Sequence, residues 1–194
     1  MVSASPQPMK TKKRTSKKTV AVRDASWPPG WTEELEREFQ EAAGPHVYDK
    51  ADWHSEGDFP KGLPEKQAFV HTGLFMGWLI EHNLISREFT RQFGRNLRTA
   101  VERFKRRAIT GPGVYEMWGG ALDSDMLTPA GNQFAGYYYD GNRFANDYRK
   151  LLTRRLPSFY HVQDTWANYD ILAPRIDARY EAWKKSHGKA KRGR

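Results

Sequence analysis

Apolar residues recur at every third or fourth position through most of the chain between residues 27 and 183, and this is the spacing of one face of an α-helix. The pattern predicts helices over residues 33–43, 64–83, 86–108, 114–118, 129–139, 143–152, 165–172 and 174–183. Several of these starts carry residues typical of helix caps or first turns, namely Thr32, Pro64, Ser86, Pro129 and Asp164. Alternation typical of a β-strand is hard to find. We therefore expect a mainly α-helical fold in a single compact domain.

The segment 46–63 does not follow the helical pattern. It is rich in Asp, Gly and Pro but includes Tyr48, Trp53 and Phe59, and this combination predicts an ordered, irregular segment held in place by its aromatic side chains. Aromatic side chains also provide the principal apolar area around three tryptophans, which we therefore expect in the core: Trp53, Trp78 and Trp166.

The helix expected over residues 86–108 has an apolar face and a basic face. Four arginines define the basic face: Arg87, Arg91, Arg95 and Arg98. This face can dock on nucleic acid or on an acidic protein, whereas the alternative is a solvated surface with local pairs such as the one between Arg98 and Glu102. Tyr138 is a further candidate for binding, since an exposed tyrosine can stack on a base or anchor a partner protein. Its alternative is core packing with a hydrogen-bonded hydroxyl.

Charge is distributed unevenly along the chain. The 194 residues carry a net charge of +9, but residues 1–26 hold seven basic residues and one acidic residue, and residues 184–194 hold six basic residues and no acidic one. The stretch 27–183 is mildly acidic, with 19 basic and 22 acidic residues. Both ends are poor in apolar residues, which predicts disordered basic tails. Such tails can bind nucleic acid without sequence specificity, or can act on solubility alone.

Composition excludes several classes of function. The chain has no cysteine, so disulfides, thiolate metal sites and a cysteine nucleophile are excluded. No apolar run approaches 18 residues, and no apolar segment follows the basic N-terminal residues, so we expect no membrane association, no secretory signal and a cytoplasmic location. Neither a glycine-rich phosphate loop nor a GxSxG nucleophile elbow is found, and we expect no cofactor.

His54, Asp58 and His71 form the sharpest candidate site. Two imidazoles and a carboxylate can hold a divalent metal with an open position for water, although these three lack the short spacing of an HExxH motif. The alternative for His71 is packing, because it shares a helical stripe with Phe75 and Trp78.

Acid/base catalysis by carboxylates is a second possibility. Asp164 and Asp170 are the candidates, because they can lie near a helix start and at least one turn onward. The alternative for Asp164 is an N-cap, since it precedes Thr165 and the next helix.

Four stretches of the sequence together resemble a bacterial domain family of unknown function. They are YDKADWHSEGDFP (48–60), HTGLFMGW (71–78), GNQFAGYYYDGNRFANDY (131–148) and FYHVQDTWANYDILAPRIDARYEAW (159–183). The resemblance covers roughly residues 47–183 and implies no established activity, cofactor or catalytic residue.

These observations divide the chain into a helical domain over 27–183 between basic tails at 1–26 and 184–194. The leading hypothesis is a non-enzymatic binding module that engages a protein partner, with non-specific nucleic-acid affinity in the tails, because no convergent catalytic set is evident. The competing hypothesis is a metal-dependent or acid/base hydrolase that uses His54, Asp58 and His71.

Overall fold

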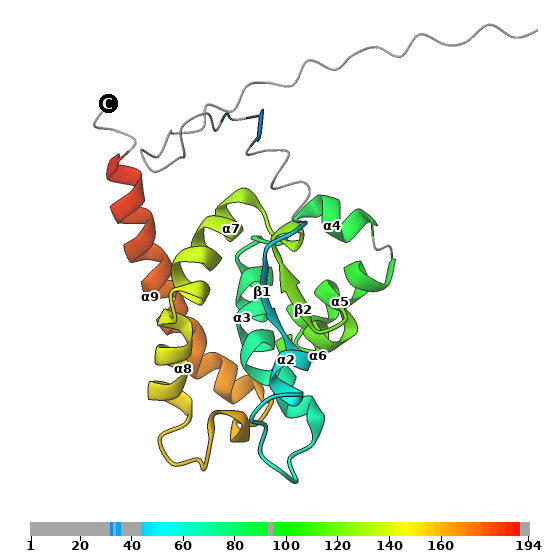
Figure 1. Ribbon diagram of the computed structural model, residues 1–194. Helices are drawn as coiled ribbons and strands as arrows, with labels where there is room; N and C mark the ends of the chain where they lie inside the picture. Colours follow the sequence, from blue (N-terminus) through cyan, green and yellow to red (C-terminus); the bar gives the residue numbers. More distant parts are fainter. Residues whose placement is uncertain (1–31, 33, 36–43, 93–94, 191–194) are drawn as a thin grey trace, which may run out of the picture. The chain divides into compact units, whose positions relative to one another are not determined.

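The computed structural model describes residues 44–92 and 95–190, together with Thr32, Glu34 and Leu35. Contacts divide the chain into two units, residues 1–42 and 43–194, and the fold belongs to the second. In the described part of that unit, eight α-helices pack with one short two-stranded sheet (Figure 1). The expected mainly helical fold is confirmed. No helix in the described ranges is long and apolar enough to cross a bilayer.

The helix predicted over residues 33–43 lies mostly outside the described residues. Glu34 and Leu35 are helical, and the backbone N–H of Leu35 donates a hydrogen bond to Oγ1 of Thr32 at 3.2 Å. This is the bond expected if Thr32 caps the helix. The predicted N-terminal tail lies outside the described residues altogether.

Helix α3 (Val70–Glu81) forms the centre of the core. Every residue from Val70 to Ile80 is buried, so the helix is enclosed on all sides. Trp78 is fully buried there, as predicted. The helix predicted over 64–83 therefore exists, but its first part is the 3-10 turn η1 (Glu65–Phe69).

Helix α6 (Gly111–Met117) approaches α3 closely because glycines lie at the contact. A Cβ atom at Gly73 would lie 2.3 Å from Cα of Pro112, and one at Gly111 would lie 2.2 Å from the carbonyl oxygen of Gly73. Only glycine leaves room for this approach. Helix α6 begins three residues before the helix predicted over 114–118, because Oγ1 of Thr110 caps it by accepting from the N–H of Gly113.

Strands β1 (Val47–Lys50) and β2 (Ala121–Asp123) pair antiparallel, with Asp49 opposite Leu122 and an irregularity between Val47 and Asp49. Helix α2 (Ala51–Ser55) follows β1 without a loop. The prediction of an irregular segment over 46–63 is therefore wrong for residues 47–55. Elements of four and five residues are too short to display a periodicity, and the strand forms because a partner more than 70 residues away pairs with it.

Trp53 is not a core residue: its side chain lies on α2 and is 55% exposed. Ala51 is buried and His54 half-buried, so the outer side of this short helix faces solvent, with the ammonium group of Lys50 5.8 Å from the Trp53 ring. Trp166 is half-buried and packs against Phe104. Of the three predicted core tryptophans, Trp78 alone is fully buried.

Two helices occupy the region for which a single helix over 86–108 is predicted. They are α4 (Arg87–Gln92) and α5 (Arg95–Lys105), and the residues between them lie outside the described ranges. Helix α5 ends before residue 108 because Arg107 adopts a left-handed conformation with φ of 55°. The basic face is consequently shared by two helices.

Helix α7 (Pro129–Ala135) continues into the π-helical turn η3 (Gly136–Asp140), and helix α8 (Arg143–Leu152) follows. Tyr138, in η3, is fully buried and donates a hydrogen bond to Asp147 at 3.2 Å. It therefore offers no surface to a base or a partner, and its assignment as a binding residue is wrong. The physical reason is that the consecutive tyrosines of η3 point in different directions and Tyr138 faces the core.

Helix α9 (Trp166–Ala190) is one helix where two are predicted. Pro174 lies inside it rather than at the start of a second helix, and the buried residues Leu172, Ile176 and Trp183 hold both halves against the core. The helix includes residues 184–190 of the predicted C-terminal tail. The remaining connections contain the 3-10 turns η2 (Ser124–Met126) and η4 (Phe159–His161).

Candidate metal centre

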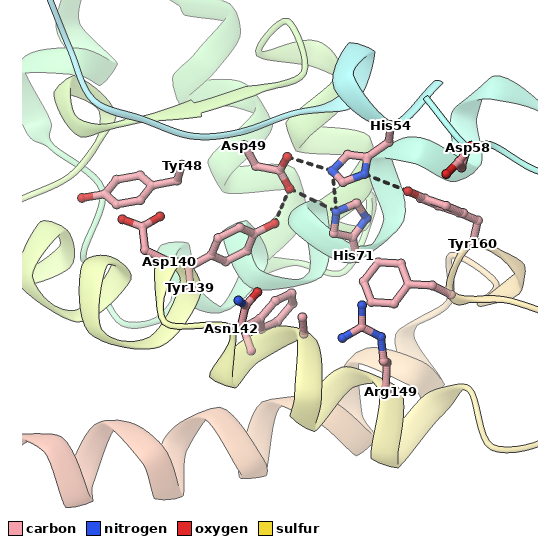
Figure 2. A pocket seen from close by; sticks show the side chains of 13 residues that line it. Tyr48, Asp49, His54, Asp58, His71, Tyr139, Asp140, Asn142, Arg149 and Tyr160 are labelled. Carbon is pink, nitrogen blue, oxygen red and sulfur yellow. Dashed lines mark hydrogen bonds and ion pairs between the residues drawn. The ribbon is translucent and has the colours of Figure 1, made fainter. Parts of the chain in front are cut away.

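Three potential metal ligands from three different elements meet at one point in the structure. Asp49 comes from β1, His54 from α2 and His71 from the first turn of α3 (Figure 2). Asp49 and His54 are five positions apart in the sequence. Their side chains point toward each other because β1 passes directly into α2. His71 reaches them because α3 is buried alongside.

The ligand atoms form a compact triangle. Oδ1 of Asp49 lies 2.8 Å from Nε2 of His54, and Oδ2 of Asp49 lies 3.1 Å from Nε2 of His71. The two Nε2 atoms are 3.1 Å apart. All three side chains therefore direct the atoms that bind metals in proteins toward one common centre.

A surrounding set of hydroxyl groups fixes this arrangement. Oγ1 of Thr72 donates to Oδ2 of Asp49 at 2.6 Å, and the hydroxyl of Tyr139 donates to the same oxygen. On the other side, the hydroxyl of Tyr160 lies 2.9 Å from Nδ1 of His54. Such outer partners orient the ligands of metal sites and set the tautomer of a ligating histidine.

The electrostatics of the site favour a negatively charged Asp49 and a neutral His71, which are the charge states of metal ligands. Burial alone would raise the pKa of Asp49, but hydrogen bonds from His54 and His71 outweigh burial and hold its pKa well below the ordinary value. Burial lowers the pKa of His71, although the neighbouring carboxylate acts in the opposite direction. The lowered pKa favours the neutral imidazole. Burial, with the charge of Asp49, raises the pKa of Tyr139 far above its ordinary value, so this phenol stays a donor.

Hydrogen bonds alone do not account for the triangle. Each Nε2 atom carries at most one proton, and three close contacts join the two nitrogens and the carboxylate. If both nitrogens are protonated, two N–H donors face each other at 3.1 Å. If one is not, it can accept from the other ring, but its contact with the carboxylate oxygen then has no hydrogen atom. A cation at the centre resolves this conflict, because every atom then directs a lone pair toward it.

The second nitrogen of the His71 ring has no partner: its Nδ1 atom is buried and has no hydrogen bond within the described residues. Leaving such an atom unsatisfied costs about 1–3 kcal/mol. All the polar contacts of this buried ring are therefore made through Nε2, which faces the centre. A ring held in this way is more easily explained by function than by stability.

The separations also define the coordination geometry that the ligands fit. With metal–nitrogen bonds of about 2.1 Å, two nitrogens 3.1 Å apart subtend an angle of about 95° at the metal. This is closer to the right angle of a six-coordinate ion than to a tetrahedral angle. Three ligands at right angles would occupy one face of such an ion and would leave the opposite face open.

A pocket of about 520 Å³ is lined by all three potential ligands, Asp49, His54 and His71. Aromatic side chains make up much of the wall, and the charged residues in it besides the ligands are Asp58, Asp140 and Arg149. A pocket of this size accommodates a small organic molecule. The site therefore combines potential ligand atoms with space for a small molecule.

The sequence analysis predicted two of these three potential ligands. His54 and His71 come together, but the carboxylate beside them belongs to Asp49, whereas Asp58 is exposed and lies in the wall of the same pocket. Asp49 was missed because its spacing from His54 acquires meaning only when a strand passes directly into a helix. The one sequence signal for it is a charged residue between Val47 and Ala51, in a stretch that turns out to be partly buried.

The other candidate residues lie apart from the triangle. Asp164 accepts a hydrogen bond from Thr110 at 2.7 Å, and Asp170 pairs with Arg107 at the surface. The first-turn hydrogen bond of α9 goes to Thr165 rather than to Asp164, from the N–H of Asn168. Neither aspartate lines the pocket beside Asp49.

The four arginines of the basic face are all exposed. Arg87 and Arg91 lie on α4, whereas Arg95 and Arg98 lie on α5. None of them lines the pocket that contains the three ligands.

Comparison with known proteins gives one match. Searches of the curated proteins and of the solved structures found no similar protein. The sequence pattern of a family described as a domain of unknown function (DUF7832) matches residues 47–162, and the matched region includes the three ligands and Tyr160. Because the match covers more than half of the 194 residues, the chain belongs to this family of domains of unknown function.

Proposed function

We propose that this protein is a metal-dependent hydrolase whose divalent ion is held by Asp49, His54 and His71. The observation that carries the proposal is the triangle of ligand atoms, with separations of 2.8–3.1 Å, at the inner end of an open pocket. Two histidines and one carboxylate with an open position are typical of catalytic rather than structural metal sites. The proposal favours the hydrolase hypothesis over the non-enzymatic one, with Asp49 in place of Asp58.

The protein residues have separable roles in this proposal. A divalent ion in such a site lowers the pKa of a coordinated water and polarises a substrate oxygen. Asp49, His54 and His71 hold the ion, and Tyr139 and Tyr160 hold two of these ligands through their hydroxyl groups. The pocket wall excludes bulk water from one side of the substrate.

Metal binding tests the proposal directly. The metal-free protein is titrated with Zn²⁺, Mn²⁺, Fe²⁺ and Co²⁺ by calorimetry, and the Co²⁺ complex is examined by absorption spectroscopy, which reports nitrogen and oxygen ligands and their number. We expect one ion per chain. His54→Ala and His71→Ala should each abolish stoichiometric binding. Asp49→Asn, which keeps the shape of the side chain, should weaken it at least about tenfold.

His82→Ala provides the matched control. His82 is a half-buried histidine that pairs with Asp177 outside the pocket, so its loss should leave the metal stoichiometry unchanged. Circular dichroism identifies any variant that fails to fold. A wild-type protein that binds none of the four ions, or ligand variants that fold and bind as the wild type does, would show that the triangle is a hydrogen-bonded cluster.

The near-right angle at the centre favours one second candidate function. Two histidines and a carboxylate on one face of a six-coordinate ion are also typical of iron(II) enzymes that activate oxygen. The two functions differ in the preferred ion and in the reaction. Oxygen uptake by the Fe²⁺-loaded protein, together with no hydrolysis by the Zn²⁺- or Mn²⁺-loaded protein, would favour oxygen activation.

Binding to polyanions is a separate proposal that rests on charge. Residues 1–26 and 184–194 each carry a net charge of +6, and four exposed arginines lie on α4 and α5. Any affinity for DNA should be weakly dependent on sequence and should decrease with salt, with a logarithmic slope of about −0.9 per phosphate neutralised. A DNA affinity that does not change with salt concentration would contradict this proposal. Binding to an acidic protein partner can be tested with the same series of salt concentrations.

A further inference from the structure

We propose that the substrate of this site is a phosphoester and that Arg149 binds a non-bridging oxygen of its phosphoryl group. The inference rests on the proposed metal-dependent hydrolase and adds the chemical class of its substrate. It starts from an arginine that lines the pocket beside the three ligands.

Arg149 extends from α8 toward the two histidines. Figure 2 shows its guanidinium group on the side of the pocket where His71 lies, and its charge is close enough to act on the pKa of His71. Its packing partner is the ring of Phe159, whose centre is 5.2 Å from the guanidinium carbon. Arg149 is exposed, and its cation is held over an aromatic ring that also lines the pocket.

No acidic side chain in the described ranges pairs with Arg149. The nearby carboxylates are paired with other residues. Asp147, two residues away on α8, pairs with Arg179 at 2.7 Å. Asp140 pairs with His46 and lies beside Tyr48, at the opposite end of the pocket from Asp58 (Figure 2). The oxygens of Asp49 accept from residues of the metal site.

A ligand anion supplies the missing partner. The planar guanidinium group matches the oxygen geometry of phosphate and carboxylate groups. Because Arg149 lies beside the metal ligands, the anionic group that it binds is also the group that meets the open face of the ion. A carboxylate there is not open to hydrolysis, whereas a phosphoryl group is both anionic and hydrolysable. The position of the arginine therefore favours a phosphoester.

The reaction balances without an oxidant or a second substrate. The oxygen of a water molecule forms a bond to phosphorus, and the bond from phosphorus to the ester oxygen breaks with its electron pair left on that oxygen. One proton of the water ends on the ester oxygen, which gives an alcohol and a phosphate. Arg149 stabilises the charge on the non-bridging oxygens, as positively charged groups do in other phosphoryl transfers. The pocket as a whole has a volume of about 520 Å³ and aromatic walls, so it also accommodates the organic part of the ester.

The test compares Arg149→Gln with the wild type, both loaded with metal. Inorganic phosphate binding is measured by calorimetry, and hydrolysis is measured with 4-nitrophenyl phosphate, bis(4-nitrophenyl) phosphate, 4-nitrophenyl sulfate and 4-nitrophenyl acetate. We expect phosphate to bind the wild type and one of the two phosphoesters to be the best substrate. Arg149→Gln should weaken phosphate binding at least tenfold and lower kcat/KM at least about 100-fold, with unchanged metal stoichiometry.

Lys150→Ala is the matched control, since Lys150 is the exposed cation next along α8 and does not line the pocket. It should behave as the wild type. A metal-loaded wild type that binds no phosphate, prefers the sulfate or acetate ester, or keeps its phosphate affinity in Arg149→Gln overturns this inference and leaves the metal centre standing. A wild type that binds no metal overturns the proposed function itself.

Discussion

Replacing Tyr139 by phenylalanine removes one hydroxyl group from the support of the metal site and leaves the ring that packs on Phe144. The hydroxyl donates to Oδ2 of Asp49 and lies 2.8 Å from Oγ1 of Thr72. A hydrogen bond to a charged group contributes about 1.5–3 kcal/mol, and Asp49 keeps its other donors in the variant. We therefore expect Tyr139→Phe to lower the free energy of unfolding of the metal-free protein by about 2 kcal/mol.

Urea unfolding, followed by tryptophan fluorescence, measures this loss. The slope of the unfolding free energy against urea concentration should be the same in the variant and the wild type. The same variant should bind metal about 10- to 100-fold more weakly, because the carboxylate loses an outer partner that orients it. Tyr148→Phe is the control. Tyr148 is also buried, but its hydroxyl makes no hydrogen bond within the described ranges, so its replacement should change stability by less than about 0.5 kcal/mol. Equal losses in the two variants, or an unchanged metal affinity in Tyr139→Phe, would refute the reasoning.

Three further predictions concern the fold. Trp78→Ala should destabilise the protein by about 3–5 kcal/mol, whereas Trp53→Ala should cost less than about 1 kcal/mol in the same urea assay, since only the first ring is buried. Gly73→Ala should cost about 1–3 kcal/mol or more in thermal unfolding, because its Cβ atom would meet the backbone of α6. Burial alone would raise the pKa of Asp147, but hydrogen bonds from Arg179 outweigh burial and lower this pKa below its ordinary value. The stability from this pair is therefore complete above the ordinary pKa and lost as pH falls through the lower folded value, and Arg179→Gln should flatten the acid limb of stability against pH.

The long elements of the fold could be predicted from local pattern. Helix α3 was identified from the spacing of its apolar residues, and the buried position of Trp78 followed from the same pattern. Proline and threonine marked the start of α7, where Oγ1 of Thr128 accepts from the N–H of Gly131. These features depend on residues within one or two turns of each other, and such interactions can be inferred along a sequence.

The short elements could not be predicted in this way. Strand β1 exists because β2 pairs with it, and α2 is a single turn between β1 and the loop that leads to η1. The exposure of Trp53 and the burial of Tyr138 depend on which side of such a short element faces the core. Periodicity contains no information on this point when an element has only four or five residues.

The sequence by itself determined that the fold is helical and that charge gathers at the two ends of the chain, and it predicted His54 and His71 as members of one candidate site. Tertiary structure alone decided that Asp49 is the carboxylate between them and that Arg149 lies in the same pocket. The three potential ligands span 22 positions of the sequence, from Asp49 to His71, and Arg149 lies 78 positions after His71. Their geometry is fixed by the packing of β1, α2, α3 and α8, and packing between distant segments leaves no spacing rule in the sequence.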